Sequence, residues 1–333
     1  MMVRIAINGF GRIGRNAFKI AMKRGLDIVA INDLTDATTL AYLLKYDSSY
    51  GIFNGIVEAK GEALIVNGRE VKVLSIKNPA ELPWSDLDID IVIEATGEYK
   101  SRKKAGLHLL AGAKQVIISA DTTEKDIKSI VMGVNEESYD PDKDNIIDNA
   151  SCTANCLVPI IKVLNDSFDI KRGVVTTIHS YTNDQKLLDH QHKDLRKARS
   201  ATESIIPTTT GAADAVGKII PSMKGKLKGI ALRVPTPNVS VVDLTVEFNR
   251  NVTVEEVNKI LKQSADDKIL GYTDEPLVSI DFKKDSRSAI VDGLSTLVID
   301  RNMVKIIAWY DNEWGYANRI VDITEYVSAK FKM

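Results

Sequence analysis

The sequence has few of the features that mark secreted, membrane-spanning or nucleic-acid-binding proteins. It has two cysteines in 333 residues, too few for the disulfide framework of a secreted domain. Its apolar runs all fall short of the roughly 18 residues that a transmembrane helix needs. Its formal net charge is −1, which gives no electrostatic basis for binding nucleic acid or an anionic membrane. We therefore expect neither nucleic-acid nor membrane partners.

Two further absences limit the class of protein. Arg4, Asn8 and Arg12 interrupt the start of the chain, which argues against a signal peptide and for a cytoplasmic location. Cys152 and Cys156 form a single C-x-x-x-C pair, which is a weak signal for zinc and for a redox couple. We expect no metal site.

A glycine motif follows the first apolar strand. Residues 9–14 read G-x-G-x-x-G, and a helix with one apolar face comes next. We expect Gly9 to make the tight turn, Gly11 to let a pyrophosphate approach the backbone, and Gly14 to let the helix pack on the strand. Asp33 ends the second strand, where an acid accepts hydrogen bonds from ribose hydroxyls. An ordinary strand–helix–strand turn is the alternative, but the combination favours a bound dinucleotide.

Strands alternate with helices through the rest of the first half, which indicates a mostly parallel, doubly wound sheet. Asn67-Gly68 predicts a hairpin turn. Ligands of such sheets bind beyond the carboxyl ends of the strands, so Thr96, Gly97 and Ser119 are candidate cofactor neighbours, with plain turn residues as the alternative. The expected strands are 3–7, 28–31, 63–66, 71–74, 89–94, 115–118 and 129–132, and the expected helices lie near 37–45, 101–111 and 124–128.

A cysteine lies at the start of a predicted helix in the middle of the chain. Apolar residues recur at helical spacing over 157–164, so the helix should begin near Ser151. Cys152 then lies in the first turn, where free backbone N–H groups and the helix dipole favour a thiolate and could hold an oxyanion. Cys152 is a candidate nucleophile, with a buried structural cysteine as the alternative. Cys156, one turn later, is interpreted as packing.

A histidine and an arginine end two strands of the second half. His179 ends strand 173–179 and is the natural base for a cysteine nucleophile, although a structural histidine is the alternative. The polar segment 180–204 is long for a loop and could bind an anion or a neighbouring subunit. Arg233 could reach a phosphate. The other expected elements are a helix after the hydroxyl-rich cap 208–211, strands 229–234, 239–248, 277–282, 288–299 and 303–310, and a final helix 317–331.

These patterns predict an α/β protein of two domains, as the chain length also suggests. The first, over 1–150, is a doubly wound (Rossmann) nucleotide-binding domain that a C-terminal helix, 316–333, rejoins. The second, over 151–315, is an α+β catalytic domain with a mostly antiparallel sheet.

The whole set of motifs resembles the phosphorylating glyceraldehyde-3-phosphate dehydrogenase family. The resemblance runs from the glycine motif to the segment 310–316, and it is most specific at 151–153 and 233–236. It implies oxidation and phosphorylation of D-glyceraldehyde 3-phosphate to 1,3-bisphosphoglycerate, a step of glycolysis and gluconeogenesis, with NAD, inorganic phosphate and a Cys152 thioester. It also implies a homotetramer with the loop 180–204 at a subunit interface.

The resemblance assigns roles to single residues. Cys152 is the nucleophile and His179 its base. Inorganic phosphate would be bound by Ser151, Thr153, Thr210 and Gly211, and the substrate's own phosphate by Thr182 and Arg233. Asn312 would bind the nicotinamide carboxamide, and Tyr316 would lie beside the nicotinamide ring. The rest of NAD would be contacted by Arg12, Ile13, Asp33 and Ser119.

The chain departs from the common family pattern at several positions. Ala154 replaces a second threonine, with little effect expected. Lys197 replaces a frequent arginine; it keeps the charge but lacks bidentate geometry, and it stays among the anion-binding candidates. Residues 77–79 and Asp121 also differ from the common family pattern, at positions that the resemblance places near the adenosine of the cofactor. His190-Gln191 stands where NAD-preferring relatives carry Leu-Pro, so NADP remains the less favoured alternative to NAD.

Two other functions stay open at this point. Erythrose-4-phosphate dehydrogenases share the Cys and His but typically lack the Thr182 and Thr210-Gly211 pattern present here. A nucleotide-binding scaffold or nucleic-acid binder would leave Cys152 and His179 without a purpose, and the net charge gives it no support.

Overall fold

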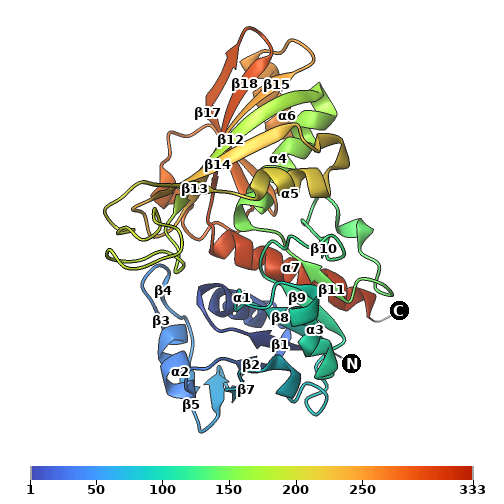
Figure 1. The fold of residues 1–333 in the computed structure, drawn as a ribbon, viewed down its shortest axis with the longest axis vertical. Coiled ribbons are helices and arrows are strands. Elements are labelled where there is room, and N and C mark those ends of the chain that lie inside the picture. Colours follow the sequence, from blue (N-terminus) through green and yellow to red (C-terminus); the bar gives the residue numbers. More distant parts are fainter. Residues whose placement is uncertain (1, 332–333) are drawn as a thin grey trace. The chain divides into compact units, whose positions relative to one another are not determined.

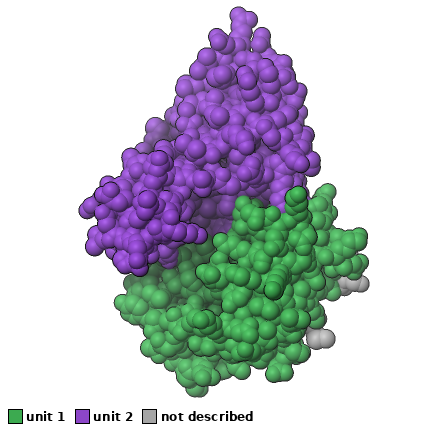
Figure 2. Space-filling model, viewed as in Figure 1, with its two compact units in different colours: residues 1–130, 136–150, 317–333 green, residues 131–135, 151–316 purple. Residues whose placement is uncertain are grey.

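The structure, a computed structural model, describes residues 2–331, and its chain divides into two compact units (Figure 2). Unit 1 comprises residues 1–130, 136–150 and 317–333, and unit 2 comprises residues 131–135 and 151–316.

This division differs from the predicted domain boundaries at two points. Residues 131–135 group with unit 2, since Gly133 packs against Ile269 of that unit. Tyr316 also groups with unit 2, although it lies within the first turn of the C-terminal helix, Trp314–Lys330. Residues 332 and 333, the end of that predicted helix, lie outside the described residues.

Unit 1 contains a largely parallel sheet, as predicted (Figure 1). The central strand, β1, pairs in parallel with β2 on one side and with β8 on the other, so the strand order reverses there. Such a reversal is the usual ligand position of a doubly wound sheet. The strand order is β10 (Lys128–Ser129), β11 (Ile146–Asp148), β9 (Gln115–Ile118), β8 (Ile91–Glu94), β1 (Arg4–Asn8), β2 (Asp27–Asn32), β7 (Arg69–Leu74), β6 (Ala63–Val66) and β5 (Val57–Ala59).

The last three strands in this order, β7, β6 and β5, are antiparallel to one another, while β7 pairs in parallel with β2. The turn between β6 and β7 has positive φ at Asn67 (50°) and Gly68 (79°), which is the predicted hairpin turn. Strands β3 (Tyr46–Asp47) and β4 (Gly51–Ile52) form a separate short ladder.

Two helices of unit 1 begin where the sequence provides side-chain caps. Asp36 caps α2 (Ala37–Lys45) and Ser101 caps α3 (Arg102–Leu110). The first helix, α1 (Arg12–Lys23), has no side-chain cap. Arg24, after the last turn of α1, contacts Asn318, Asp322 and Glu325 of α7 (Trp314–Lys330).

The predicted helix 124–128 is wrong. Glu124 accepts a hydrogen bond from the backbone of Arg102, and Asp126 pairs with the Arg102 guanidinium, so the segment is held against α3 in an irregular form. Five residues with one apolar side chain also cannot offset the cost of starting a helix. The strand predicted over 129–132 is shorter and begins one residue earlier, at Lys128.

Unit 2 is a mostly antiparallel sheet with helices packed on it (Figure 1), as predicted. Two neighbouring pairs, β12–β14 and β16–β17, are parallel. The strand order is β13 (Ile206–Thr209), β14 (Leu227–Val234), β12 (Ile170–Ser180), β15 (Ser240–Phe248), β18 (Met303–Tyr310), β17 (Ala289–Ile299) and β16 (Leu270–Thr273), and the helices are α4 (Cys152–Phe168), α5 (Ala212–Ile219) and α6 (Val254–Gln263).

One face of this sheet is buried and the other is not. Side chains alternate between buried and part-exposed along β15 and β18, which is the pattern of a sheet covered on one face. On the less covered face Val174 is 59% exposed and Ile230 is 53% exposed.

The strand predicted over 277–282 is instead a loop ending in a 3₁₀ turn, Ser279–Phe282. Asp281 accepts a hydrogen bond from the backbone of Val278, which curls the chain. Leu277 and Phe282 therefore reach the same apolar cluster, although an alternating strand would place them on opposite faces. The remaining 3₁₀ turns are Pro79–Glu81, Glu136–Ser138 and Pro221–Met223.

Candidate active site

The three motif glycines of unit 1 meet three different steric conditions. Gly9 has φ +94°, and a methyl group there would lie 2.7 Å from the backbone nitrogen of Thr96. A methyl group at Gly14 would lie 2.1 Å from the carbonyl oxygen of Gly9. A methyl group at Gly11 would meet no described atom within 4 Å. The turn therefore has open space only in front of Gly11, where the uncapped α1 begins.

Asp33 is held against this turn. Its Oδ2 accepts a hydrogen bond from the backbone N–H of Phe10 at 2.8 Å, and its Oδ1 accepts one from Thr35 at 3.0 Å. The carboxylate thus has a fixed position at the carboxyl end of β2.

Arg12, in the first turn of α1, is anchored by a residue that the sequence did not single out. Its Nη1 lies 2.9 Å from Oδ1 of Asp47, and its guanidinium lies over the ring of Tyr50. Lys19 is the second cation beside Asp47, at 3.3 Å. Burial opposes ionisation of Asp47, but the hydrogen bond and charge of Arg12 outweigh it and lower its pKa to about 2.

The other nucleotide candidates of unit 1 also lie at strand or helix ends. Thr96 and Gly97 follow β8, and Gly97 has φ +77°. Ser119 follows β9; its hydroxyl oxygen is buried and has no hydrogen-bond partner among the described residues. Ile13 is half-buried in the first turn of α1.

In unit 2 the structure brings Cys152 and His179 together. Cys152 opens α4, whose N-cap Ser151 accepts a hydrogen bond from the backbone of Ala154 at 3.1 Å. His179 is the penultimate residue of β12 and is 5% exposed. Cys152 Sγ lies 3.4 Å from His179 Nε2, which is hydrogen-bonding distance for sulfur.

The electrostatics of this pair differ from the sequence-based expectation of a thiolate. Burial raises the pKa of the Cys152 thiol, and the positive charge of Arg233 opposes this rise without cancelling it. Burial and then Arg233 lower the pKa of His179 to about 3. Both groups are therefore neutral near pH 7. The expectation of a thiolate was wrong because the loss of solvation at this buried position raises the pKa of the thiol more than the helix terminus lowers it.

The second ring nitrogen of His179 faces two competing groups. Nδ1 lies 2.7 Å from the carbonyl oxygen of Ser180, which can only accept, and 2.7 Å from Nη1 of Arg233, which can only donate. One nitrogen can satisfy only one of them at a time. Arg233 also donates to the Ser180 carbonyl at 3.0 Å, and its own Nε is buried without a partner among the described residues.

A buried tyrosine that the sequence reasoning missed joins two threonines beside the pair. The hydroxyl of Tyr310 lies 2.9 Å from Oγ1 of Thr153 and 3.0 Å from Oγ1 of Thr177. Its ring meets that of His179 edge-on. Its position at the end of β18 is the signal that could have identified it, since β12 and β14 also end at site residues.

Thr182 and Lys197 of the long loop meet through a shared carboxylate. Thr182 donates its hydroxyl to Asp184, and Nζ of Lys197 lies 2.7 Å from the other oxygen of Asp184. Partial burial opposes ionisation of Asp184, but Lys197 and then Thr182 outweigh it and keep its pKa below the usual range. Lys197 is thus in an ion pair.

Thr210 and Gly211 precede α5. The hydroxyl oxygen of Thr210 accepts a hydrogen bond from the backbone of Ala212 at 3.2 Å, and its proton stays available as a donor. Gly211 is the N-cap of α5 and has no side chain to cap it. Since α5 packs on α4, this helix start and that of Cys152 belong to adjacent helices.

Asn312 is linked to the cysteine site through Ser240, another residue that the sequence reasoning missed. Ser240 Oγ accepts from the backbone N–H of Ser180 at 3.1 Å and donates to Oδ1 of Asn312 at 2.9 Å. This fixes the Asn312 carbonyl, so its NH₂ group points elsewhere. Tyr316 is 6% exposed.

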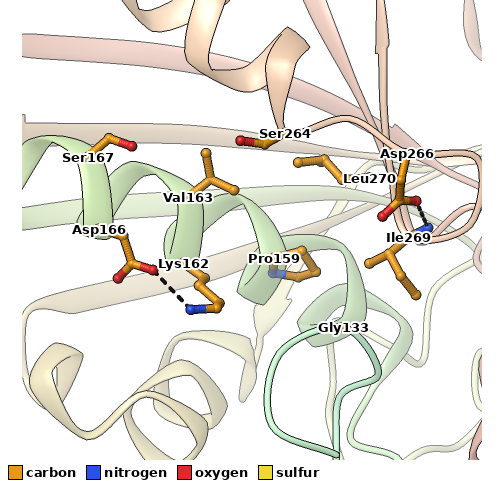
Figure 3. Close-up of a pocket in the computed structure, with 10 residues that line it drawn as sticks. All are labelled: Gly133, Pro159, Lys162, Val163, Asp166, Ser167, Ser264, Asp266, Ile269 and Leu270. Carbon is orange, nitrogen blue, oxygen red and sulfur yellow. Dashed lines mark hydrogen bonds and ion pairs between the residues drawn. The ribbon is translucent and has the colours of Figure 1, made fainter.

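A separate cavity of 260 Å³ lies farther along α4, and none of the candidate residues lines it (Figure 3). Its polar groups include the ion pair of Lys162 and Asp166, at 2.9 Å. Within residues 2–331, no group of three His, Cys, Asp or Glu residues is arranged to hold a metal ion. In the same range, no helix has the length and apolar character needed to cross a membrane.

Comparison with known proteins gives matches over both units. Residues 3–102 match the family model "Glyceraldehyde 3-phosphate dehydrogenase, NAD binding domain", and residues 151–312 match "Glyceraldehyde 3-phosphate dehydrogenase, C-terminal domain". Proteins named glyceraldehyde-3-phosphate dehydrogenase from Geobacillus stearothermophilus and Borreliella burgdorferi are 55% and 52% identical to the chain. The alignments cover 99% and 97% of this chain, and 99% of each relative.

A doubly wound nucleotide-binding sheet, followed along the chain by a buried thiol–imidazole pair, defines an NAD-dependent oxidoreductase that acts on aldehydes. More narrowly, the chain belongs to the glyceraldehyde-3-phosphate dehydrogenase family.

Proposed function

We propose that the chain converts D-glyceraldehyde 3-phosphate to 1,3-bisphosphoglycerate with NAD and inorganic phosphate, through a thioester on Cys152. The observation that carries the proposal is the 3.4 Å approach of Cys152 Sγ to His179 Nε2 at the start of α4. The names of its relatives, glyceraldehyde-3-phosphate dehydrogenase, support the substrate. In this proposal unit 1 is the NAD-binding domain and unit 2 the catalytic domain.

The first step needs one tautomer of His179. When Nδ1–H donates to the Ser180 carbonyl, Nε2 has a free lone pair towards the thiol. Nε2 then takes the Cys152 proton as Sγ adds to the aldehyde carbon, and it returns the proton to the carbonyl oxygen, giving a hemithioacetal. Neutral thiol and neutral imidazole are the correct starting pair for this transfer.

The second step oxidises the hemithioacetal. The oxidation needs an acceptor for the hydride of the hemithioacetal carbon, which NAD would supply when bound. Nε2 of His179 removes the hydroxyl proton at the same stage, so the carbonyl re-forms as a thioester. A phosphate oxygen then attacks the thioester carbon, and the Cys152 thiolate leaves.

The reaction needs two anion sites, because both the substrate and the nucleophile carry phosphate. We assign the substrate's phosphate to Thr182 and Arg233. The buried Nε of Arg233 has no partner among the described residues and so is available to an anion. Lys197 adds positive charge but is paired with Asp184. We assign inorganic phosphate to Ser151, Thr153, Thr210 and Gly211, which lie at the starts of α4 and α5.

The unit 1 residues fit NAD in four respects. The space in front of Gly11 is open, α1 is uncapped, Asp33 is fixed, and the Ser119 hydroxyl is buried without a described partner. In this proposal Asp33 holds the ribose hydroxyls and Asn312 the carboxamide. The other NAD contacts are Gly9, Arg12, Ile13, Gly14, Thr96, Gly97, Ser119 and Tyr316.

We also propose a cytoplasmic homotetramer. The less covered sheet face of unit 2 exposes Val174 and Ile230, and the segment after β12 exposes Leu187, Leu188 and Leu195 at 68–83%. Exposed apolar side chains in this number are typical of surfaces that another subunit covers.

One assay tests the proposed reaction. NADH formation from glyceraldehyde 3-phosphate is followed with and without inorganic phosphate. Rapid turnover only with phosphate is the expected result. Equal steady-state rates without phosphate would point to a hydrolytic aldehyde dehydrogenase and contradict the proposal.

A further inference from the structure

Three neighbouring strands of unit 1 end in buried polar residues directly before the loops assigned to NAD. Asn8 of β1 pairs side by side with Asn32 of β2 and with Glu94 of β8. Asn8 and Glu94 are each 1% exposed. A carboxylate with so little solvent requires hydrogen bonds from the protein to compensate its lost hydration.

The donors on the β2 side have a fixed direction. Oδ1 of Asn32 accepts from the backbone N–H of Ile76 at 2.9 Å, so the Asn32 amide cannot be turned round. Its Nδ2 donates to Oδ1 of Asn8 at 2.7 Å. The Asn8 amide is fixed in turn, and its Nδ2 donates to Oε2 of Glu94 at 2.5 Å.

The donors on the other side are fixed as well. Nε1 of Trp84 lies 3.0 Å from Nδ1 of His108. An indole N–H can only donate, so Nδ1 accepts and the imidazole proton is on Nε2. That nitrogen lies 3.1 Å from Oε2 of Glu94, and it donates to the carboxylate from a neutral ring.

Thr96 completes the set from the loop itself. Its backbone N–H donates to Oε1 of Glu94 at 2.8 Å, and its hydroxyl donates to the same oxygen. Four donors from three different segments thus converge on one carboxylate. A glutamine at position 94 would have the same shape, but its NH₂ group would place a donor against at least one N–H donor whose direction is fixed.

We propose that Glu94 is a positioning residue for NAD: as the common acceptor of this network, it fixes the turns at Gly9, Asp33 and Thr96 in the geometry that holds the dinucleotide. This inference rests on the proposed assignment of those turns to NAD. The fixed directions of the donors make an acceptor-only side chain necessary at position 94.

The test compares NAD affinity, measured by calorimetric titration, in the full-length wild type, Glu94→Gln and Glu94→Asp. Glu94→Gln should raise the Kd for NAD about tenfold, which corresponds to about 1.4 kcal/mol. The KM for NAD should rise in parallel, while kcat changes less than about twofold. Glu94→Asp, which is shorter but keeps two acceptor oxygens, should raise the Kd less than Glu94→Gln does.

Asp322→Asn is the matched control, since it makes the same carboxylate-to-amide change in unit 1. Asp322 pairs with Arg24, at the opposite end of α1 from the glycine turn. It should lower the melting temperature and leave the Kd within about twofold.

The outcomes are distinguishable. Wild-type NAD affinity in Glu94→Gln would overturn the inference but not the proposed cofactor assignment. A larger loss of NAD affinity in Glu94→Asp than in Glu94→Gln would also overturn it, because that order is expected if the side chain of Glu94 acts only through packing. An equal loss of affinity in Asp322→Asn would also overturn it. If Glu94→Gln does not fold, a rise of about tenfold or more in the Kd of Glu94→Asp decides against the inference, because a side chain with two acceptor oxygens would then fail to preserve NAD binding. A wild type that binds no NAD would overturn the proposed cofactor assignment itself.

Discussion

Arg233 and the Ser180 carbonyl compete for one nitrogen of His179, and the outcome decides whether the imidazole can act as a base. With Nδ1 accepting from Arg233, the proton of the neutral ring is on Nε2, and the thiol proton has no acceptor there. With Nδ1–H donating to Ser180, Nε2 is free. A substrate phosphate that draws Arg233 away would favour the second state.

Cys152→Ser should lower turnover by about a thousandfold or more, because a serine hydroxyl is a far weaker nucleophile next to a neutral imidazole. NAD affinity should stay within about twofold, since the thiol lies outside the proposed dinucleotide residues. Steady-state NADH formation and calorimetry measure the two effects. Cys156→Ala is the control and should keep most of the activity; if it lost as much as Cys152→Ser, the nucleophile assignment would fail.

Arg233→Gln should move the alkylation of Cys152 by iodoacetamide to higher pH. The Arg233 charge opposes the rise in the pKa of the thiol, so its removal raises that pKa further. Alkylation rates measured against pH test this. Arg172→Gln, which removes an exposed charge from the neighbouring strand β12, should leave the profile unchanged. A shift to lower pH in Arg233→Gln would contradict the account.

The catalytic efficiency, kcat/KM, with NAD should exceed that with NADP by well over tenfold. Two backbone hydrogen bonds hold the Asp33 carboxylate against the glycine turn, so it cannot move away from a 2′-phosphate. Like charges about 4 Å apart cost roughly 4 kcal/mol near a protein surface. Kinetics with both cofactors give the ratio, and Asp33→Asn should narrow it. Parity in the wild type would mean that the exposed His190-Gln191 pair decides the preference.

At the scale of elements, the ion pair of Arg12 and Asp47 ties the start of α1 to β3. The pKa of Asp47 is lowered to about 2, from its ordinary value of 3.8. Because the pKa is lower in the folded state, ionised Asp47 stabilises the fold. This stabilisation is fully present above pH 3.8 and is lost as the pH falls through about 2. At 1.36 kcal/mol per unit the shift corresponds to about 2 kcal/mol at neutral pH.

Asp47→Asn should therefore lower the melting temperature at pH 7 by about 4–8 °C, and the difference from wild type should narrow as the pH falls from 4 to 2. Calorimetric melts over this pH range measure it. Asp166→Asn, which removes one end of an exposed pair on α4, should change the melting temperature little. A pH-independent difference for Asp47→Asn would mean that packing, rather than charge, causes the loss.

The sequence predicted the elements whose signal is local. The glycine turn, the hairpin at Asn67 and the start of α4 each depend on residues within a few positions of one another. It missed groups that only the packing of distant elements brings together, such as Tyr310 with Thr153 and Thr177. It also missed Ser240 and Glu94, whose partners lie 60 or more residues away in the chain or on adjacent strands.

The neutral state of Cys152 could not be predicted either. A helix start is visible in the sequence, but the degree of burial that raises the pKa of the thiol depends on the packing around it. The failed prediction at 277–282 has the same origin: its alternation is that of a strand, and the hydrogen bond from Val278 to Asp281 decides otherwise.

At the scale of the whole molecule, the sheet face of unit 2 that carries Val174 and Ile230 is proposed to be covered in a tetramer. Val174→Lys should shift the sedimenting mass to dimers or monomers, because a charge at a buried apolar contact is unfavourable. Sedimentation velocity measures the change. Leu110→Lys alters an exposed apolar residue of unit 1 and should leave the mass unchanged. An unaltered tetramer in Val174→Lys would exclude this face.

The division of the chain between the units has a consequence for gene design. The chain passes between units after residues 130, 135, 150 and 316, so neither unit is a continuous stretch of sequence. A fragment that stops at residue 150 keeps Arg24 but loses its partners on α7, Asn318, Asp322 and Glu325. Exchange of the nucleotide-binding half between two homologues therefore requires three separate segments from one parent. A crossover at 150 alone places the last helix of one parent against Arg24 of the other.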